Sequence, residues 1–374
     1  MLLSWPKPYG DECLSSWLSR LARENLCDPY LFVKHHFQTN LWAKDIDKYL
    51  DDKHLSVICS ITPYPQSQIT KLLMPQYKFY GIERTPNNNS EITLLNTTLV
   101  GFRKTKPWLQ YCPLCLKESP YYRRHWRLAH VTVCPKHNIK LYDRCFRCAE
   151  PINFHRLDVR HDSMLRCDKC LVLLTKAPII KVNDTALISL TKQIITANEQ
   201  HWIKWQSLDI HSFLLFKGLA FLVKGIRRSI FCLLCDQLKD QRPDYTTLSL
   251  SIRFEIMSII ARLLSQWPEN LVALHKSQYF CQSAFYQETR HKWPYWLHQV
   301  MRTKLSKEYC HVSEDEITQA IKLLIKMGYA PSQPNIGEIL GKDRSFKIPK
   351  RLKSKFASQV KQETHLMRVF SWKN

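Results

Sequence analysis

With 374 residues, 45% of them hydrophobic, the chain is long enough for two or three domains with buried cores. Its formal net charge of +23 predicts a polyanion, such as nucleic acid, as a partner. The N-terminus lacks a signal-peptide core and the most apolar tract, residues 213–234, contains four basic residues, which argues against secretion and membrane insertion and favours the cytoplasm.

Two helices with recognisable starts are predicted near the N-terminus. Asp11 and Glu12 are acidic residues of the kind that open a helix, and Asp28 before Pro29 resembles an N-cap followed by proline at the first helical position. The first helix has a predicted buried face with helical spacing: Leu14, Trp17, Leu18 and Leu21. We therefore expect an N-terminal helical region over residues 1–106.

A candidate helix-turn-helix lies at residues 53–75. Two short helical patterns, KHLSVICSI and SQITKLLMP, flank a break at TPYPQ. Such a corner reads DNA in some proteins, but in many helical domains it only packs against the core or contacts another protein. Both interpretations stay open at this point.

Four metal-ligand pairs dominate the next region, residues 107–176. Each pair has two intervening residues, and the eight ligands are Cys112, Cys115, Cys134, His137, Cys145, Cys148, Cys167 and Cys170. The pairs form two modules with the same eighteen-residue gap, and a shift of 33 residues superimposes the ligands of one on the other. Four ligands close a tetrahedron, so we predict tandem structural zinc modules with two zinc ions per chain. Buried thiols, disulfides and an iron–sulfur cluster are the alternatives, but fourteen cysteines without a secretion signal fit metal binding better.

The first module contains an arginine- and aromatic-rich segment, SPYYRRHWRLAH, at residues 119–130. Arg123, Arg124 and Arg127 alternate with aromatic residues that are able to stack on bases, which makes them candidate nucleic-acid or partner contacts. The competing interpretation is packing of Trp126 beside the metal and offsetting of the thiolate charge. The sequence favours the second interpretation, because a zinc module has little core of its own.

From Val182 onward the pattern is helical, and we expect residues 177–374 to form an all-helical domain. Three tracts, at residues 186–200, 212–238 and 246–267, have apolar residues three and four positions apart. Cys232 and Cys235 form a fifth Cys-x-x-Cys pair, but no second pair follows, so they are predicted to be buried thiols. Strand signals are sparse, and the predicted fold class is mainly α.

The last predicted helices lead into a basic tail. Ser313 and Glu316 form a capping box for a helix that ends at Gly328, and a shorter helix with Ile336 and Ile339 follows. This is a second helix-turn-helix-like corner. The tail after it contains five basic residues that are candidate nucleic-acid contacts, although a basic run is an unspecific signal: Lys347, Lys350, Arg351, Lys353 and Lys355. A solvated helix face is the alternative.

Catalytic signatures are missing from the sequence. It contains neither H-E-x-x-H nor G-x-S-x-G, and its acidic residues are few and scattered. We therefore expect a binding protein and not an enzyme. A zinc-dependent nuclease is disfavoured, because both predicted metal sites have four protein ligands and no open position.

Three ordered motifs resemble the TniQ/TnsD family of transposon target-selection proteins. They are PKPYGDECLSSWLSRLARENL, YCPLCLKE and YYRRHWRLAHVTVCPKHNIKLYDRC, and the match covers about the first 180 residues. The resemblance implies a helix-turn-helix-containing N-terminal region, tandem zinc modules and a bacterial, nucleoid-associated protein without catalysis of its own. Only the eight ligands and Trp126 map onto motif positions.

Two branches of that family compete. The length, the zinc modules and the helical C-terminal half resemble the TniQ of a type I-F-like CRISPR-associated transposon. That branch implies a homodimer that docks on Cascade with its CRISPR RNA, contacts DNA near the target site and recruits the AAA+ ATPase TnsC. The alternative is a TnsD-like protein that binds a fixed attachment site, which the net charge of +23 and the basic tail favour.

Overall fold

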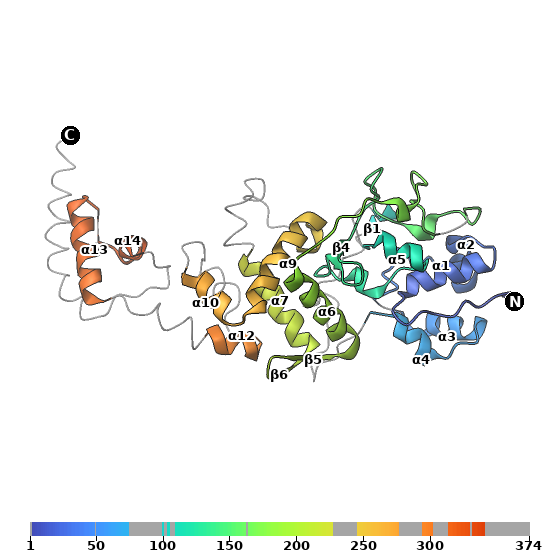
Figure 1. Ribbon diagram of the computed structural model, residues 1–374, viewed down its shortest axis with the longest axis horizontal. Helices are drawn as coiled ribbons and strands as arrows, with labels where there is room; N and C mark the ends of the chain where they lie inside the picture. The colour runs from blue at the N-terminus through green and yellow to red at the C-terminus, as the bar shows by residue number, and fades with distance from the viewer. Residues whose placement is uncertain are drawn as a thin grey trace. The chain divides into compact units, whose positions relative to one another are not determined.

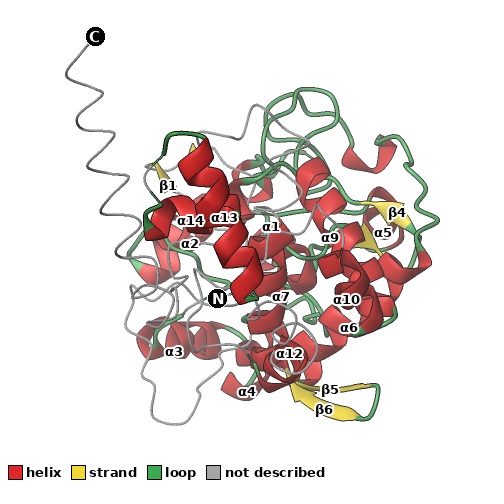
Figure 2. Ribbon diagram, turned by 90° about the vertical axis from the view of Figure 1, so that its left-hand side faces the viewer, coloured by secondary structure: helices red, strands yellow, loops and turns green. Residues whose placement is uncertain are grey.

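A computed structural model describes residues 2–48, 50–74, 99–100, 103–104, 109–161, 164–226, 245–276, 294–301, 313–329 and 331–340. The chain divides into two compact units, Met1–Pro294 and Tyr295–Asn374. Across these described ranges the structure is mainly helical with short two-stranded sheets, which confirms the predicted fold class (Figures 1 and 2). The predicted domain boundaries after residues 106 and 176 stay predictions.

The N-terminal helices of the larger unit pack around α1 (Leu14–Glu24). Leu14, Trp17, Leu18 and Leu21 are fully buried, as predicted, and share one core with residues of α2 (Pro29–Phe37), η1 (Leu41–Ala43) and α3 (Asp52–Ile61). Burying four such side chains stabilises this corner of the fold by about 1.5–3 kcal/mol each.

The predicted start of α1 needs correction, whereas the predicted start of α2, with Asp28 at the N-cap and Pro29 as the first helical residue, is confirmed. Helix α1 begins at Leu14, and Glu12 lies before it as a buried carboxylate that accepts hydrogen bonds from Arg20 Nε at 2.9 Å and Ser16 Oγ at 2.8 Å. Asp28 does occupy the N-cap position of α2, but its Oδ1 accepts the backbone N–H of Val159 at 2.6 Å. Asp28 therefore joins α2 to a distant segment, whereas Glu12 binds side chains of α1, and neither side chain caps its own helix.

The first helix-turn-helix candidate is present as a corner. Helix α3 is followed by a single α turn, α4 (Gln66–Ile69), which continues as the 3₁₀ turn η2 (Thr70–Leu72). Ile69 and Leu72 are buried in the same core as Leu55 and Ile58. Packing therefore accounts for the apolar pattern of this segment.

Short strands and turns build the cysteine-rich region. The strands are β1 (Leu99–Val100) with β2 (Arg103–Lys104) and β3 (Val133–Cys134) with β4 (Ile139–Lys140), both antiparallel; the helical turns are α5 (Pro113–Glu118), η3 (Arg124–Arg127), η4 (Phe154–Arg156) and η5 (Leu174–Lys176). Backbone pairs extend this region on both sides of β4. Tyr111 and Tyr142 exchange hydrogen bonds of 2.8 and 3.0 Å, while Lys140 donates to Ile180 O at 2.9 Å and Val182 donates to Asn138 O at 2.9 Å.

Three helices form the body of the C-terminal part of the larger unit: α6 (Thr185–Gln200), α7 (Ser212–Ile226) and α9 (Leu250–Ser265). They lie against one another, and η8 (Tyr245–Thr247) and α10 (Glu269–Lys276) flank α9 (Figure 1). Helices α6 and α9 match the predicted tracts closely. Cys232 and Cys235 lie outside the described residues.

A β-hairpin interrupts the predicted all-helical half. Strands β5 (Trp202–Trp205) and β6 (Leu208–His211) pair antiparallel and project from the edge of the helices (Figure 2). His201, with a left-handed φ of 65°, ends α6 immediately before β5. Ile203 and Trp205 are buried while Trp202 and Lys204 are exposed, the alternation typical of a half-buried strand.

The smaller unit contains α12 (Tyr295–Val300), α13 (Glu314–Lys326) and α14 (Gln333–Ile339). The predicted capping box of Ser313 and Glu316 is present, and Gly328 has the positive φ of 76° expected after the helix end. Helices α13 and α14 pack through Ile317, Ile321 and Ile336. The basic tail, with Lys347 to Lys355, lies outside the described residues.

Among the described helices, none combines the length and the apolar character that crossing a bilayer requires.

Candidate metal centres and the arginines around them

The four ligands of the first predicted module converge on one point. Cys112 and Cys115 come from the start of α5, and Cys134 and His137 come from the turn between β3 and β4. The Sγ atoms of Cys115 and Cys134 are 3.6 Å apart, and Nδ1 of His137 lies 3.3–3.5 Å from all three sulfurs. The imidazole therefore presents Nδ1, and not Nε2, to the centre of the cluster.

The second module repeats this arrangement with four sulfurs. Cys145 and Cys170 are 3.6 Å apart at Sγ, and Cys148 and Cys167 are 3.5 Å apart. In both clusters all four ligand atoms lie within 4.8 Å of one another. The pairing within modules, first pair with second and third with fourth, is as predicted.

The donor sets fit one tetrahedral metal ion each. A Zn–S distance of about 2.3 Å places thiolates of a tetrahedron about 3.8 Å apart, close to the separations seen here. A multi-iron cluster spreads its four thiolates further apart, because they bind more than one iron. All ten cysteines of the described ranges are free of disulfide bonds, so neither cluster is a disulfide pair. The ligand number leaves no position for water, which is typical of structural sites.

Three of the four ligand pairs share the same strained turn. Asn138, Ala149 and Leu171 each follow the second ligand of a pair and have left-handed φ values of 53°, 58° and 57°. In each case the residue donates its N–H to the carbonyl of the first ligand, at 2.8–3.0 Å. Alanine and leucine rarely adopt this conformation, at a cost of about 1 kcal/mol or more. A bound ion would hold these turns closed.

Glu118 supports the one histidine ligand. Its Oε1 lies 2.8 Å from Nε2 of His137, and its second oxygen binds Lys136. A carboxylate on the outer nitrogen fixes the ring orientation and the tautomer that exposes Nδ1, and it makes that nitrogen a stronger donor to a metal. Glu118 was not predicted, because it lies at the end of α5, nineteen residues from His137, where no local sequence pattern marks it.

Arg127 is an internal cation, which corrects the expectation that it contacts nucleic acid. Its side chain is fully buried, and its guanidinium binds Asp45 Oδ2 at 2.7 Å and Asp47 Oδ2 at 2.6 Å. The two carboxylates outweigh the effect of burial and raise the pKa of Arg127 above its usual value. The preferred interpretation of this segment as packing therefore holds for Arg127, but its charge is balanced by two carboxylates and not by thiolates. Its neighbour Trp126 is also fully buried, as predicted.

Arg123 and Arg124 are both less deeply buried than Arg127. Arg123 is 8% exposed, forms an ion pair with Asp11 at 3.3 Å and lies over the rings of Tyr121 and Trp126. Arg124 is half-buried, donates to Gly10 O at 3.0 Å and lies near enough to Glu199 on α6 to counteract the rise of that carboxyl's pKa on burial. Of the three predicted arginine contacts, Arg124 retains the most accessible charge.

A second buried arginine was not predicted. Arg253 of α9 is fully buried and donates to Gln110 Oε1 at 3.1 Å, Ala129 O at 2.9 Å and Asp143 Oδ2 at 3.2 Å. These acceptors belong to the cysteine-rich region, so Arg253 fastens the helical body to it. Burial lowers the pKa of Arg253 from its usual value.

Residues 3–141 match the sequence model of the TniQ family. The chain is a TniQ-domain protein. The predicted family is thereby confirmed, and the TniQ domain marks a transposition-associated target-selection protein. A comparison with curated proteins finds no match to the chain.

The TniQ domain ends between the two metal centres. It contains α1 to α5 and the first cluster up to His137, whereas Cys145 to Cys170 follow it. The second centre nevertheless repeats the geometry of the first. The cysteine-rich region therefore extends beyond the TniQ domain as one structural continuation.

Proposed function

We propose that this chain is a non-catalytic target-selection adaptor of a type I-F-like CRISPR-associated transposon. It docks on Cascade with its CRISPR RNA and recruits the AAA+ regulator TnsC, which engages the transposase. The observation that supports this proposal is a TniQ domain joined to two clusters of four residues that could each hold a metal ion. Zinc, two ions per chain, is the metal we assign to them, because it prefers four tetrahedral thiolate and imidazole ligands.

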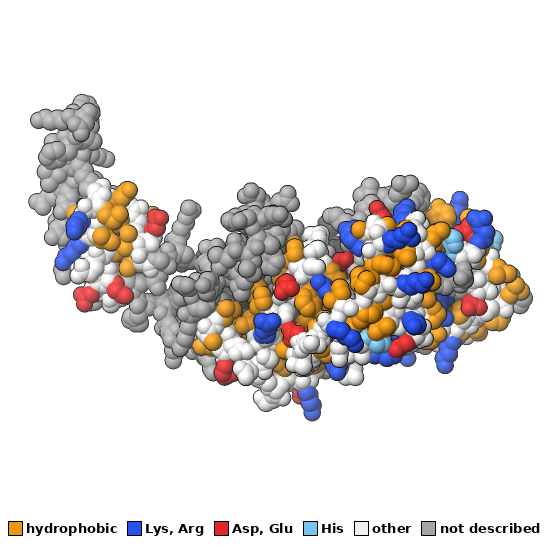
Figure 3. Space-filling model, turned by 45° about the horizontal axis from the view of Figure 1, so that its top comes forward, with side chains coloured by type: hydrophobic (Ala, Val, Ile, Leu, Met, Phe, Trp, Pro, Cys, Tyr) orange, Lys and Arg blue, Asp and Glu red, His pale blue; other side chains and the backbone are white. Residues whose placement is uncertain are grey.

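The adaptor role follows from what the metal centres offer chemically. With four protein ligands each, they have no open position to activate water or polarise a phosphate. Their role is to fold the chain, so binding energy comes from the surfaces around them. On the face shown in Figure 3, Lys and Arg side chains are scattered among hydrophobic ones, a mixture suited to protein and nucleic-acid partners together.

A pull-down tests the adaptor role. We expect the tagged chain to co-purify with the CRISPR RNA-loaded Cascade of the same transposon, and to retain TnsC in the presence of ATP. By light scattering the purified chain should have about twice the mass of the 44.4 kDa protomer, since we propose a homodimer. Cascade assembled without this chain is the control and should not retain TnsC.

A TnsD-like DNA reader is the second candidate, favoured by the net charge of +23. Such a reader prefers its site over random DNA by about a thousandfold or more. In a gel-shift competition we expect the isolated chain to bind every duplex equally well, so that the ratio of its affinities for any one site and for random DNA is near one. A single strongly preferred duplex, together with no Cascade in the pull-down, would replace the adaptor proposal with the TnsD-like function.

The proposed site of action is the bacterial cytoplasm, at the nucleoid, on DNA near the target. The predicted contacts in the basic tail, Arg351 and Lys353, belong to this proposal. Their charge reversal should weaken binding to all DNA sequences about equally, because phosphate contacts carry no sequence information.

A further inference from the structure

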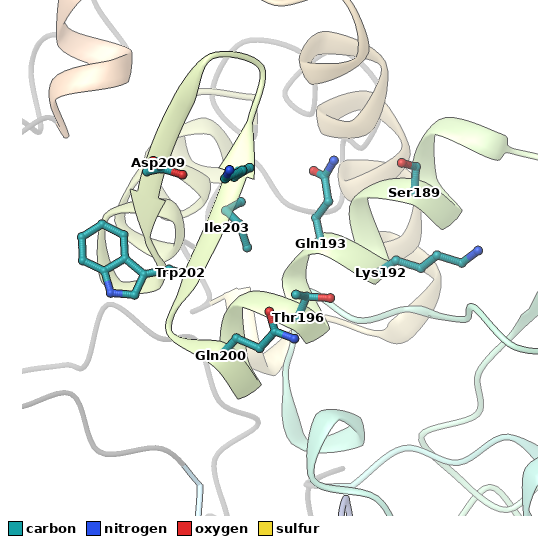
Figure 4. Close-up of a pocket in the computed structure, with 9 residues that line it drawn as sticks. Ser189, Lys192, Gln193, Thr196, Gln200, Trp202, Ile203 and Asp209 are labelled. Atoms are coloured by element: carbon teal, nitrogen blue, oxygen red, sulfur yellow. The ribbon is translucent and has the colours of Figure 1, made fainter.

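An open groove lies between helix α6 and the β5–β6 hairpin (Figure 4). Its volume is about 450 Å³, enough for one nucleotide-sized group. Nine residues line it: Ser189, Lys192, Gln193, Thr196, Gln200, Trp202, Ile203, Lys204 and Asp209. Seven of these nine side chains are polar or charged, and Trp202 and Ile203 are the apolar ones.

The hairpin wall presents an aromatic ring next to a cation. Alternation along β5 places Trp202 and Lys204 on the outer face, and Trp202 is 56% exposed. Across the hairpin, Trp202 faces His211, whose ring lies 5.0 Å away at 82°, and Lys204 faces Asp209. The perpendicular histidine steadies the indole while more than half of its surface stays open to solvent.

The helix wall supplies hydrogen-bonding groups. Ser189, Lys192, Gln193, Thr196 and Gln200 recur at helical spacing and form one polar stripe of α6. Gln193 points toward the hairpin, while Lys192 and Trp202 extend at opposite ends of the groove (Figure 4). The amide side chains offer both donors and acceptors, and the ends of the groove offer a cation and a stacking surface.

We propose that this groove binds single-stranded nucleic acid, with one base stacked on Trp202 and neighbouring phosphates on Lys204 and Lys192. An exposed indole stacks on any base, because every base has a π face. The amides of Gln193 and Gln200 can donate to and accept from a base edge. Two lysines with one carboxylate, Asp209, give the lining a net charge of +1, in a chain whose net charge is +23.

The same lining argues against other occupants. Peptide grooves usually offer apolar pockets for anchor side chains, but Ile203 is only 7% exposed and leaves the indole as the single large apolar surface among the lining residues. Duplex DNA keeps its bases stacked inside the helix, so it offers no free base face to Trp202. An unpaired strand is the ligand that uses the ring, the amides and the cations together.

This inference goes beyond the proposed function, because an adaptor can bridge two proteins without touching an unpaired strand. Either DNA or RNA presents the same bases and phosphates to Trp202. The test therefore uses both, and it uses the isolated full-length chain, so that its outcome is independent of Cascade and TnsC.

Fluorescence anisotropy of labelled oligo-dT and oligo-U of about 15 nucleotides measures the binding. Trp202→Ala should weaken it roughly 5- to 150-fold, the range expected for losing one stacked base, and Trp202→Phe should recover much of the loss. A plot of the logarithm of the binding constant against the logarithm of the salt concentration has a slope that counts phosphate contacts. Lys192→Ala and Lys204→Ala should each reduce the magnitude of this slope by about 0.7. A preference of one oligomer over the other identifies the source of the strand.

Matched controls separate a local effect from misfolding. Trp5→Ala removes another exposed indole, at 41% exposure, and Lys224→Ala removes an exposed lysine of α7; neither should change binding more than about twofold. Equal oligonucleotide affinity of the wild type and Trp202→Ala, with unchanged thermal melting, would overturn the proposal. Binding of polyglutamate but not of oligonucleotide, lost in Trp202→Ala, would also overturn it and assign the groove to a protein partner.

Discussion

Arg127 lies where two distant parts of the larger unit meet. Its guanidinium forms an ion pair with Asp47 inside the fold, where Asp47 also accepts hydrogen bonds from the backbone and hydroxyl of Ser15, at 2.6 and 2.8 Å. Removing one partner of a buried ion pair leaves an uncompensated charge, which is the costly way to break it.

We therefore expect Arg127→Met to lower the free energy of unfolding by about 3–5 kcal/mol. Arg124→Met, three residues earlier and half-buried, is the matched control and should cost about 1 kcal/mol, because it loses one hydrogen bond to Gly10 O. Thermal unfolding of the three proteins side by side gives the comparison. Similar melting temperatures for both variants would show that the Asp45–Asp47 pair does not need its cation.

His130 should make stability depend on pH. Burial, followed by the charge of Arg253, lowers its pKa to about 3, whereas an imidazole in the unfolded chain titrates near 6.5. The unfolded chain alone takes up the proton between these values. The contribution to stability is therefore complete above pH 6.5, and the free energy of unfolding falls below it by up to about 1.4 kcal/mol per pH unit.

Denaturant unfolding at pH 7 and pH 5.5 measures this slope. His130→Phe keeps the ring contacts with Phe216 and Tyr245 and should flatten the dependence, while His35→Phe on the exposed face of α2 should leave it unchanged. Identical slopes for the wild type and His130→Phe would refute the assignment.

For single residues, the sequence was most informative where the residues that contact one another are close in the chain. The two four-residue clusters were predicted, because each pair spans only two intervening residues and the modules repeat. The ion-pair partners of Arg127 were not predictable, since Asp45 and Asp47 lie about eighty positions earlier. Spacing identifies a local turn, but a burial partner across the fold leaves no comparable pattern.

Among the elements, the metal-binding turns are the ones whose folding should depend on an ion. We expect elemental analysis to find two zinc ions per chain. Cys112→Ser and Cys148→Ser should each lose one ion and prevent soluble folding, because metal binding in such modules is part of the folding free energy. Cys59→Ser, on α3 and outside both clusters, is the control and should retain both ions. A wild-type content well below two would contradict this.

The outer carboxylate of the first centre gives a finer test. Glu118→Gln removes the charge opposite His137 and should reduce metal affinity at that centre about 10- to 100-fold. Competition with a chelator measures the release of the first and of the second ion, and so separates the effect on this centre from any effect on the other. The all-cysteine centre should release its ion at the wild-type rate, so faster release from both centres would point to general destabilisation instead.

The hairpin β5–β6 shows why one element was missed. Its signal, WIKW, alternates over only four residues between two long helical tracts, and the helical pattern on either side dominated the prediction. The left-handed residue His201 that ends α6 is not a glycine, so the helix stop carried no usual mark. Long periodic helices such as α6, α9 and α13 were predictable because their apolar faces repeat several times.

At the scale of the larger unit, Arg253 links the helical body to the cysteine-rich region, and its removal should destabilise the contact between these two parts. Arg253→Met leaves Ala129 O, Gln110 and Asp143 without their shared donor, and we expect it to cost about 3 kcal/mol. Arg262→Met, nine residues later on the exposed face of α9, should cost about 0.5 kcal/mol or less. Limited proteolysis should release the helical body from the cysteine-rich region only in the first variant. Identical digestion patterns would rule out this linking role.

The backbone hydrogen bonds on both sides of β4, here called the backbone ladder, limit where such proteins could exchange segments during evolution. The TniQ match ends at residue 141, between Lys140, which donates to Ile180 O, and Tyr142, which pairs with Tyr111. Recombination at that point would sever hydrogen bonds on both sides and separate Arg253 from two of its acceptors, Gln110 and Ala129. A crossover near residue 294, where the two compact units part, leaves the ladder, both metal centres and Arg253 in one inherited block. An exchange of the segment after Pro294 would therefore keep the whole of the larger unit intact.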